Sequence, residues 1–209
     1  MPATIHTARP IARTRASDFA DKQRDLLRHA AAVIAEQGID KASMAQIAAR
    51  SGVSKALIYH YYPSRDALIH AIIETHLADL DAAVEAADDP TLAPPDRLRA
   101  LVHAVLDTYR GADNEHVVQL NAKRALSAEQ QEGLALIERR IVKRFAQVIE
   151  LVNPALRSPA RPLLMPVTMS LFGMMNWVYM WFKEGGPVTR EDYADLATTI
   201  LLEGVRKVC

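Results

Sequence analysis

Residues 43–68 read SMAQIAARSGVSKALIYHYYPSRDAL, and this stretch predicts two short helices packed at a steep angle. Ser43 is a good helix N-cap, and Gln46 stands three residues later, as a capping box requires. Gly52 ends the first helix, and Ser54 caps a second helix over residues 55–61. A helix, a three-residue turn with glycine and a second helix together form the plan of a helix-turn-helix.

The two short helices have an apolar side and an outward side. Ile47, Ala48, Val53 and Ile58 are the apolar points that hold the pair together. The outward side of the second helix then presents a cation, a methyl group and two aromatic rings with polar tips. Such side chains suit the major groove of DNA, where base edges offer acceptors and thymine methyls and phosphates line the rim. They belong to Lys55, Ala56, Tyr59 and His60.

Further helices are expected on both sides of this unit. One should cover about residues 21–37 and end at Gly38, and another should run from Ser64 to about residue 87. Beyond the Pro-rich segment 88–95, apolar periodicity and capping residues indicate helices at about 96–110, 114–125, 128–152 and 163–182, and a last one capped by Thr189. The sequence therefore predicts an all-α chain of about nine helices. We expect a flexible basic arm over residues 1–20, a three-helix helix-turn-helix domain over 21–66 and a helical domain over 67–209.

Charge is distributed unevenly although the net charge is zero. Residues 1–62 hold nine Lys and Arg against five Asp and Glu, so the remainder of the chain is acidic. A basic first third on an acidic body suits a nucleic-acid-binding head. The basic arm either reaches along DNA or is a solvated tail.

Cysteine usage and hydropathy indicate the compartment. Cys209 is the single cysteine, which excludes an intramolecular disulfide and a cysteine-based metal cluster. No export signal is visible, so we expect a cytoplasmic protein. Residues 163–182 form an uncharged run long enough to span a bilayer. The run contains Pro166, Gly173 and Asn176 and lies among amphipathic helices, so we expect a buried helix of a bundle and no membrane span.

The segment 43–68 resembles the signature of the TetR family of one-component bacterial repressors. Three departures stand out: Ala56 where the family often has glycine, Leu57 where Thr or Ala is frequent, and Tyr62 in place of phenylalanine. Ala56 and Leu57 put the base preference in doubt. The resemblance is carried by Ile47-Ala48, Gly52-Val53-Ser54, Ile58-Tyr59, Tyr61-Tyr62, Ser64-Arg65-Asp66 and Leu68.

The resemblance implies DNA contacts for some of these positions and their neighbours. Lys55 and Ala56 would lie against base edges, or Lys55 is a solvated lysine. Tyr59 would touch a thymine methyl or a phosphate. Tyr61 either contacts a phosphate or packs in the core, whereas Tyr62 is expected in the core. The full DNA-binding set implied is Ser43, Ser54, Lys55, Ala56, Tyr59, His60, Tyr61 and Arg65, with Ser43, His60 and Arg65 on phosphates.

The resemblance also implies a homodimer joined through the last two helices, which would bind a near-palindromic operator. A small-molecule effector would enter the C-terminal domain, making it the ligand-binding and dimerisation domain. Residues 171–182, followed by Gly185-Gly186, are similar to the corresponding helix of TetR-type regulators that respond to acyl-CoA thioesters. The ligand-binding residues expected from this are Met174, Asn176, Trp177 and Met180, unless these side chains belong to plain core and dimer interface.

Two details of this pocket stay open. Asn176 is a polar residue in an apolar run and needs a partner, which is either a ligand carbonyl or a backbone group. The phosphates of a nucleotide would need cations, although a solvated helix face explains the available cations equally well. They are Lys123, Arg124, Arg139, Arg140, Lys143 and Arg144.

Other function classes have less support. An enzyme is not expected, because the sequence has no phosphate loop, no nucleophile elbow and no metal-spaced histidine pair. His70 and His76 lie on different helix faces, and no catalytic residue, metal or cofactor is expected. A ligand-independent architectural DNA-binding protein on the same fold is the main alternative. A regulator of cationic drugs is another, but it would need buried acids near aromatics, which residues 163–182 lack.

Overall fold

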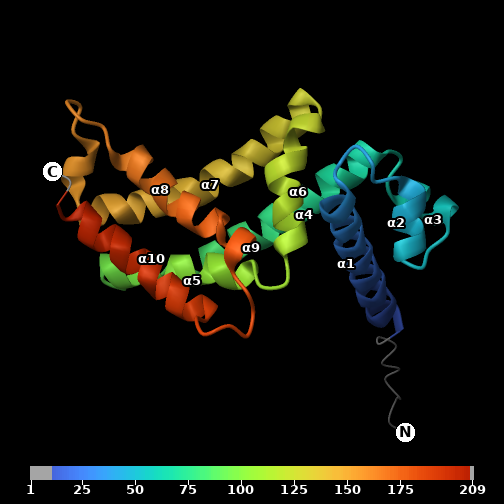
Figure 1. Cartoon of the computed structure of the whole chain (residues 1–209), viewed down its shortest axis with the longest axis horizontal. Coiled ribbons are helices and arrows are strands. Elements are labelled where there is room, and N and C mark those ends of the chain that lie inside the picture. The colour runs from blue at the N-terminus through green and yellow to red at the C-terminus, as the bar shows by residue number, and fades with distance from the viewer. Residues whose placement is uncertain (1–10, 208–209) are drawn as a thin grey trace, which may run out of the picture.

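The computed structural model describes the backbone of residues 11–207 and the side chains of residues 21–207, and its regular elements are all helical. Figure 1 shows an elongated molecule in which a small head, α1 to α3, sits at one end of a long helical body. The predicted all-α class is confirmed. The helices are α1 (Ile11–Gln37), α2 (Met44–Arg50), α3 (Lys55–Tyr61), α4 (Arg65–Ala87), α5 (Pro94–Thr108), α6 (Asp113–Ala122), η1 (Lys123–Ala125), α7 (Ala128–Val152), η2 (Pro154–Arg157), α8 (Leu164–Asn176), α9 (Val178–Trp181) and α10 (Arg190–Val205).

The helix-turn-helix forms as the sequence predicts. Ser43 and Gln46 make the capping box of α2, and Ser54 caps α3 by accepting a hydrogen bond from the backbone of Leu57. Ile47 and Ile58 are both fully buried between the two helices and α1. Gly52 in the turn has a φ of +65°, the left-handed region that glycine enters without steric cost. Local capping and one glycine therefore determine the angle between α2 and α3.

The first helix is longer than predicted. It begins at Ile11, ten residues before the expected start, and ends at Gln37 as expected. Residues 11–20 contain Ala and Arg but neither Gly nor Pro, so nothing in their sequence stops a helix from propagating toward the N-terminus. The expected arm is thus helical from residue 11, and its first ten residues lie outside the described part of the chain.

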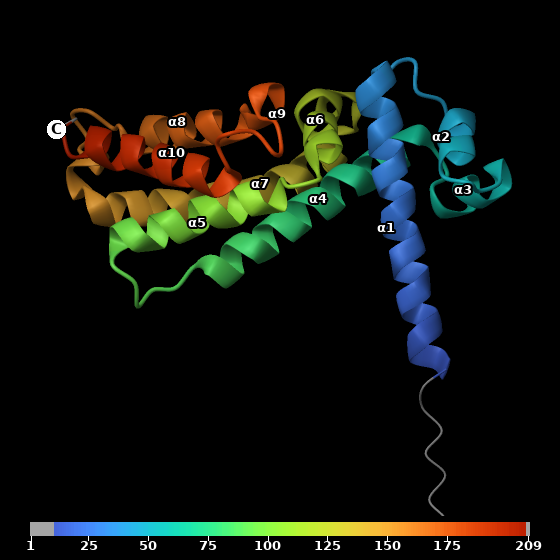
Figure 2. The same cartoon turned by 60° about the horizontal axis from the view of Figure 1, so that its bottom comes forward.

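Helix α4 joins the head to the body. Its first turns pack against α1, and its later turns contact α5, α6 and α7. Figure 2 shows α4 running diagonally beneath α5 and α7, with α8 and α10 forming the layer on the other side. The buried side chains of α4 recur at helical spacing from Leu68 to Val84, so one apolar stripe serves both parts of the molecule.

The apolar run at 163–182 does not form one helix. It divides into α8, which ends at Asn176, and the single turn α9. Side chains take over two carbonyls at the break: Tyr193 Oη donates to Met174 O (3.1 Å) and His116 Nε2 donates to Asn176 O (3.2 Å). These tertiary hydrogen bonds satisfy groups that a longer helix would have paired internally. No helix in the described part of the chain is long and apolar enough to cross a membrane.

Two glycine substitutions should change stability in opposite directions. Gly52→Ala places a side chain at positive φ and should lower the free energy of unfolding by about 1 kcal/mol. Gly133→Ala, in the interior of α7, should raise it by about 0.5–1 kcal/mol because alanine is the better helix former. A Cβ at either position meets no atom within 4 Å, so packing does not confuse the comparison. Urea unfolding at one fixed protein concentration measures both, and a stabilised Gly52→Ala variant would contradict the turn geometry.

Candidate functional site

The exposed side of α3 presents an aligned pair of side chains. Lys55 Nζ lies 5.9 Å from the centroid of the Tyr59 ring one turn later, and Tyr59 is 42% exposed. Ala56 and His60 are exposed beside them, while Ile58 faces the core. A cation over an exposed ring gains about 0.5–1 kcal/mol, little enough for Lys55 to exchange the ring for another partner. The four outward side chains that the sequence indicated do share one exposed surface.

Ser43 and Ser54 both cap helices, but they differ in whether the hydroxyl proton is free to donate a hydrogen bond to DNA. The Ser43 hydroxyl accepts from Gln46 N (3.3 Å) and donates to Gln46 Oε1 (2.7 Å), so its proton is already used. The Ser54 hydroxyl accepts from Leu57 N (3.1 Å), and its proton meets no acceptor among residues 21–207. Ser54 is therefore the better placed of the two for a phosphate.

The remaining residues expected at DNA are more deeply set. Arg65 is half-buried and donates from Nη1 to Ile39 O at 2.9 Å, so part of its guanidinium ties α4 to the loop after α1. Tyr61 is half-buried and packs against the core. Tyr62 is buried, as expected: its hydroxyl accepts from Gln23 Nε2 (3.1 Å), and burial raises its pKa.

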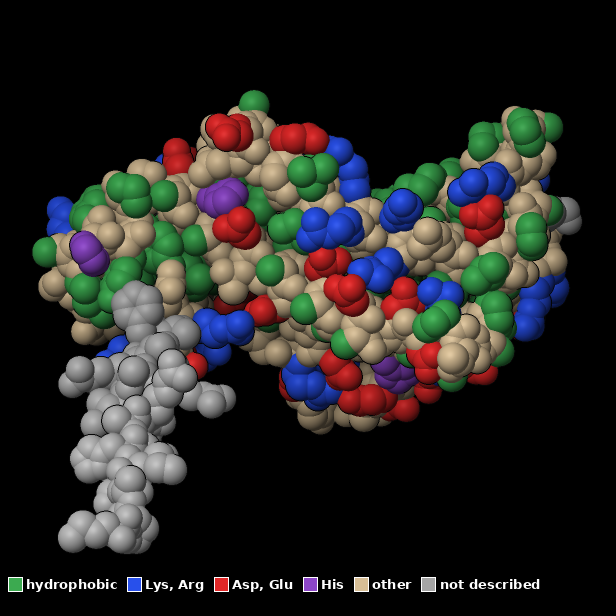
Figure 3. Space-filling view, turned by 180° about the vertical axis from the view of Figure 1, so that it is seen from behind, with side chains coloured by type: hydrophobic (Ala, Val, Ile, Leu, Met, Phe, Trp, Pro, Cys, Tyr) green, Lys and Arg blue, Asp and Glu red, His purple; other side chains and the backbone are tan. Residues whose placement is uncertain are grey.

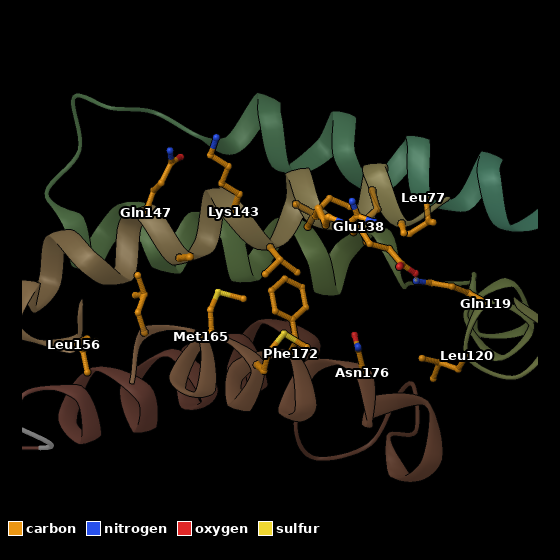
Figure 4. A pocket seen from close by; sticks show the side chains of 18 of the residues that line it. Leu77, Gln119, Leu120, Glu138, Lys143, Gln147, Leu156, Met165, Phe172 and Asn176 are labelled. Carbon is orange, nitrogen blue, oxygen red and sulfur yellow. Dashed lines mark hydrogen bonds between the residues drawn. The ribbon is translucent and has the colours of Figure 1, made fainter. Parts of the chain in front are cut away.

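A cavity of about 920 Å³ lies in the body between α7 and α8. Figure 4 shows it as a long space, with Lys143, Gln147, Leu156 and Met165 toward one end and Gln119, Leu120 and Asn176 toward the other. Leu77 and Leu80 of α4 and Tyr109, the residue that follows α5, also line it. Such a volume suits a small organic ligand. The apolar lining includes Leu77, Leu80, Ile141, Val142, Leu156, Leu164, Met165, Met169 and Phe172.

Of the four residues expected to bind a ligand, the structure brings Asn176 to this cavity. Met174 is half-buried against the core, whereas Trp177 and Met180 are 59% and 56% exposed and point elsewhere. The expectation assumed one continuous helix, and the break after Asn176 turns the following residues away from the cavity. Met165 and Met169, one and two turns into α8, line it instead, together with the missed residues Tyr109 and Gln119.

Three aromatic rings, those of His76, Tyr109 and His116, pack against one another beside Asn176 and form what we call the ring wall. Tyr109 Oη donates to Asn176 Oδ1 at 2.9 Å, and the Tyr109 ring centroid lies 4.3 Å from that of His116 and 5.8 Å from that of His76. All three rings are buried. Burial lowers the pKa of His76 to about 4, with a smaller contribution from His116, and it also lowers the pKa of His116. Both histidines are therefore neutral at physiological pH. The sequence offered no signal for this wall, because its three residues come from segments far apart in the chain: α4, the end of α5 and α6.

Some basic side chains of α7 line the cavity, and others form ion pairs with α4. Arg139 and Lys143 line the cavity, as does Arg157 from η2; Lys143 makes no ion pair among the described residues. Arg140 and Arg144 face the other way: Arg140 Nη2 lies 2.8 Å from Asp81 Oδ2, and Arg144 pairs with Glu85. Figure 3 shows acidic and basic side chains interspersed over one face of the body, consistent with such pairs.

One acid of α7 also lines the cavity. Glu138 accepts from Gln119 Nε2 at 3.4 Å and is ion-paired with Lys123. Of the six cations expected to meet phosphates, four are ion-paired with carboxylates: Lys123, Arg139, Arg140 and Arg144. Residues 21–207 contain no group of three or more His, Cys, Asp and Glu that could share a metal ion, and His70 stands beside Glu74 at 3.7 Å as an ordinary i,i+4 pair.

Comparison with known protein families accounts for both parts of the molecule. Residues 26–72 match the family described as bacterial regulatory proteins, tetR family. Residues 91–205 match the family described as tetracyclin repressor-like, C-terminal domain. The first match covers the head and the first turns of α4, and the second covers the body that holds the cavity.

Individual proteins are similar over nearly the whole chain. The HTH-type transcriptional repressor KstR2 of Mycobacterium tuberculosis is 24% identical over 189 residues, which cover 89% of this chain and 94% of that protein. A TetR-family transcriptional regulator from Bordetella parapertussis has a solved structure with a TM-score of 0.80 and 28% identity, covering 90% of this chain and 97% of that one. AibR, solved in complex with isovaleryl coenzyme A and operator DNA, has a TM-score of 0.73 and 26% identity, covering 87% and 98%.

The buried His76 should make stability depend on pH. Its pKa is depressed in the folded protein, so its full contribution is present above pH 6.5 and is lost as pH falls toward 4, where only the unfolded chain accepts the proton readily. Between pH 7 and pH 5 the wild type should lose about 2 kcal/mol more free energy of unfolding than His76→Phe. Urea unfolding at the two pH values measures this, and equal losses would show that His76 is not held neutral by burial.

Proposed function

This chain belongs to the TetR family of bacterial regulatory proteins, and we propose that it is a repressor that leaves its operator when a small amphipathic molecule fills the cavity. One observation carries the proposal. Helix α4 supports the helix-turn-helix with its first turns and supplies Leu77 and Leu80 to the cavity wall with its later turns. A ligand that changes the spacing of α7 and α8 therefore presses on the element that positions the head.

Specific DNA binding is proposed for the exposed side of α3. Lys55, Ala56 and Tyr59 would face base edges, and Ser54 and His60 would contact phosphates at the rim of the groove. Tyr61 and Arg65 would contribute at their exposed edges. Ser43 would contribute to phosphate binding indirectly, by capping α2, because its hydroxyl proton is already donated to Gln46.

A homodimer through α8 and α10 is proposed for the body. Trp177, Met180 and Trp181 at the end of α8 and in α9 are each about half exposed, and so are Leu196 and Ile200 on α10. Exposed apolar side chains gathered on one face mark a protein interface. A two-fold dimer would hold two α3 helices for two half-sites.

An acyl-CoA thioester is the effector that we propose. The acyl part would lie among Ile141, Met169 and Phe172, and the phosphates would meet Arg139, Lys143 and Arg157. The complex of AibR with isovaleryl coenzyme A supports this class of ligand for a body of similar fold. A cationic ligand is disfavoured, because Glu138, an acid in the cavity wall, is already neutralised by Lys123.

Sites selected from a random pool of DNA duplexes should yield one near-palindromic motif. We expect Lys55→Ala and Tyr59→Ala to lower affinity for it by about tenfold each, since a good base contact is worth about 1–3 kcal/mol. The control is Lys207→Ala, an exposed lysine at the opposite end of the molecule, which should bind as the wild type does. Binding without any motif that fades as salt rises would instead support the architectural protein.

Decanoyl-CoA, and more weakly isovaleryl-CoA, should raise the melting temperature and release the selected DNA, whereas coenzyme A without an acyl group should not. At a hundred times its Kd, a ligand specific for the folded state stabilises by about 2.7 kcal/mol. Lys143→Ala should weaken thioester binding about fivefold, the size of one exposed ion pair. If neither thioester changes melting or DNA affinity, the effector is not an acyl-CoA.

A further inference from the structure

We infer that the effector carries a neutral oxygen, a carbonyl or hydroxyl, at the end remote from its charged group, and that Asn176 Nδ2 donates a hydrogen bond to this oxygen. The inference rests on the proposed function and specifies the chemistry of the ligand. Three observations support it: the orientation of the Asn176 amide, the apolar side chains along α8, and the positions of the charged residues in the cavity.

The cavity is apolar along most of α8. The side chains that this helix contributes are Leu164, Met165, Met169, Phe172 and Asn176, of which only the last is polar. Met165 and Asn176 are eleven residues apart, or about 16 Å along the helix axis. A ligand that extends along α8 therefore meets one amide at the far end of an apolar passage (Figure 4).

Two hydrogen bonds fix the position of Asn176, and one of them is made to its side-chain amide. Oδ1 accepts from the buried Tyr109 hydroxyl at 2.9 Å, and the main-chain oxygen of Asn176 accepts from His116 Nε2 at 3.2 Å. The Tyr109 ring is buried and packs against both His76 and His116, which restricts its rotation. With Oδ1 so engaged, Nδ2 is left as a donor, and it meets no acceptor among residues 21–207.

The nearby charges specify a neutral acceptor. Glu138 and Gln119 line the same end of the cavity, and Lys123 already neutralises the Glu138 carboxylate. This end therefore offers no unpaired positive charge to a ligand carboxylate, whereas a neutral oxygen needs none. Lys143 stands toward the opposite end, where an anionic group is favoured. The cavity thus selects an amphipathic anion whose apolar part ends in a ketone or alcohol.

A matched pair of thioesters tests this inference by isothermal calorimetry. 9-Oxodecanoyl-CoA and decanoyl-CoA differ by one carbonyl near the chain end. The oxo compound should bind the wild type about tenfold more tightly, a difference of about 1.4 kcal/mol. Equal affinities, or a preference for decanoyl-CoA, would overturn the inference while leaving the acyl-CoA effector intact.

Variants of cavity residues test whether Asn176 causes the preference for the oxo compound. In Asn176→Leu/Tyr109→Phe both hydrogen-bonding partners are removed together, so no buried polar group is left unpaired, and the ratio of the two affinities should fall to about one. In Tyr109→Phe alone the amide is free to turn, so the ratio of the two affinities should fall part of the way; a purely structural role of Tyr109 would leave this ratio unchanged. Gln147→Leu, an amide at the other end, should change both affinities equally. A ratio that survives in the double variant would overturn the inference.

The free acids separate this inference from the proposed effector class. If neither thioester binds, 9-oxodecanoate and decanoate are compared in the same way, because the inference concerns the oxygen and not the coenzyme. A preference for the oxo acid that the double variant abolishes would support the inference and reject acyl-CoA as the effector. No binding of any of the four compounds would overturn both.

Discussion

The structure depends on the burial of one apolar stripe along α4. Leu68 and Ile69 are buried near the head, Ile72 and Ile73 at the junction, and Leu77, Leu80 and Val84 within the body. Each of these side chains contributes about 1.5–3 kcal/mol when it is fully buried, so the helix cannot release either part without a large cost. Because one helix is packed into both parts, the proposed ligand response would reach the head as a rotation or shift of α4. A flexible linker at this place would keep the two parts independent.

Polar side chains also join α4 to the rest of the body. Asp81, almost fully buried on α4, accepts two hydrogen bonds from Arg140 of α7. Arg140 neighbours Arg139, which lines the cavity, so adjacent residues of α7 face the cavity and α4. The Arg140 side chain is 57% exposed but Asp81 is buried, so removing Arg140 would leave a buried carboxylate without its cation, which is costly. The ring wall of His76, Tyr109 and His116 gives a second connection, from Asn176 in the cavity to α4 itself. Both connections are contacts between discrete packed groups, as a two-state response requires.

Much of the fold follows from local sequence. The bounds of α3, α4 and α7 agree with prediction, because Ser54, Ser64 and Ser127 each cap their helix and because residues that cannot continue it follow. The start of α1 was missed because helix propagation through residues 11–20 leaves no stop signal to read. The break of α8 was missed for the opposite reason: residues 171–182 favour a helix locally, but His116 and Tyr193, distant in sequence, take its last carbonyls. Local rules cannot anticipate a hydrogen bond that the tertiary fold creates.

The sequence by itself determined the helical class, the helix-turn-helix and its outward face, since caps, glycine turns and 3.6-residue periodicity act over a few residues. It also singled out Asn176, because a polar group in an apolar run must be paired. The tertiary structure decided which side chains share the cavity: it brought in Tyr109, Gln119 and Glu138, kept Asn176 and turned Trp177 and Met180 outward. It also decided that Arg65 uses part of its hydrogen-bonding capacity on the main chain of Ile39. The physical reason is that periodicity states which face of a helix is buried, whereas the partner of that face depends on the crossing of helices far apart in the chain.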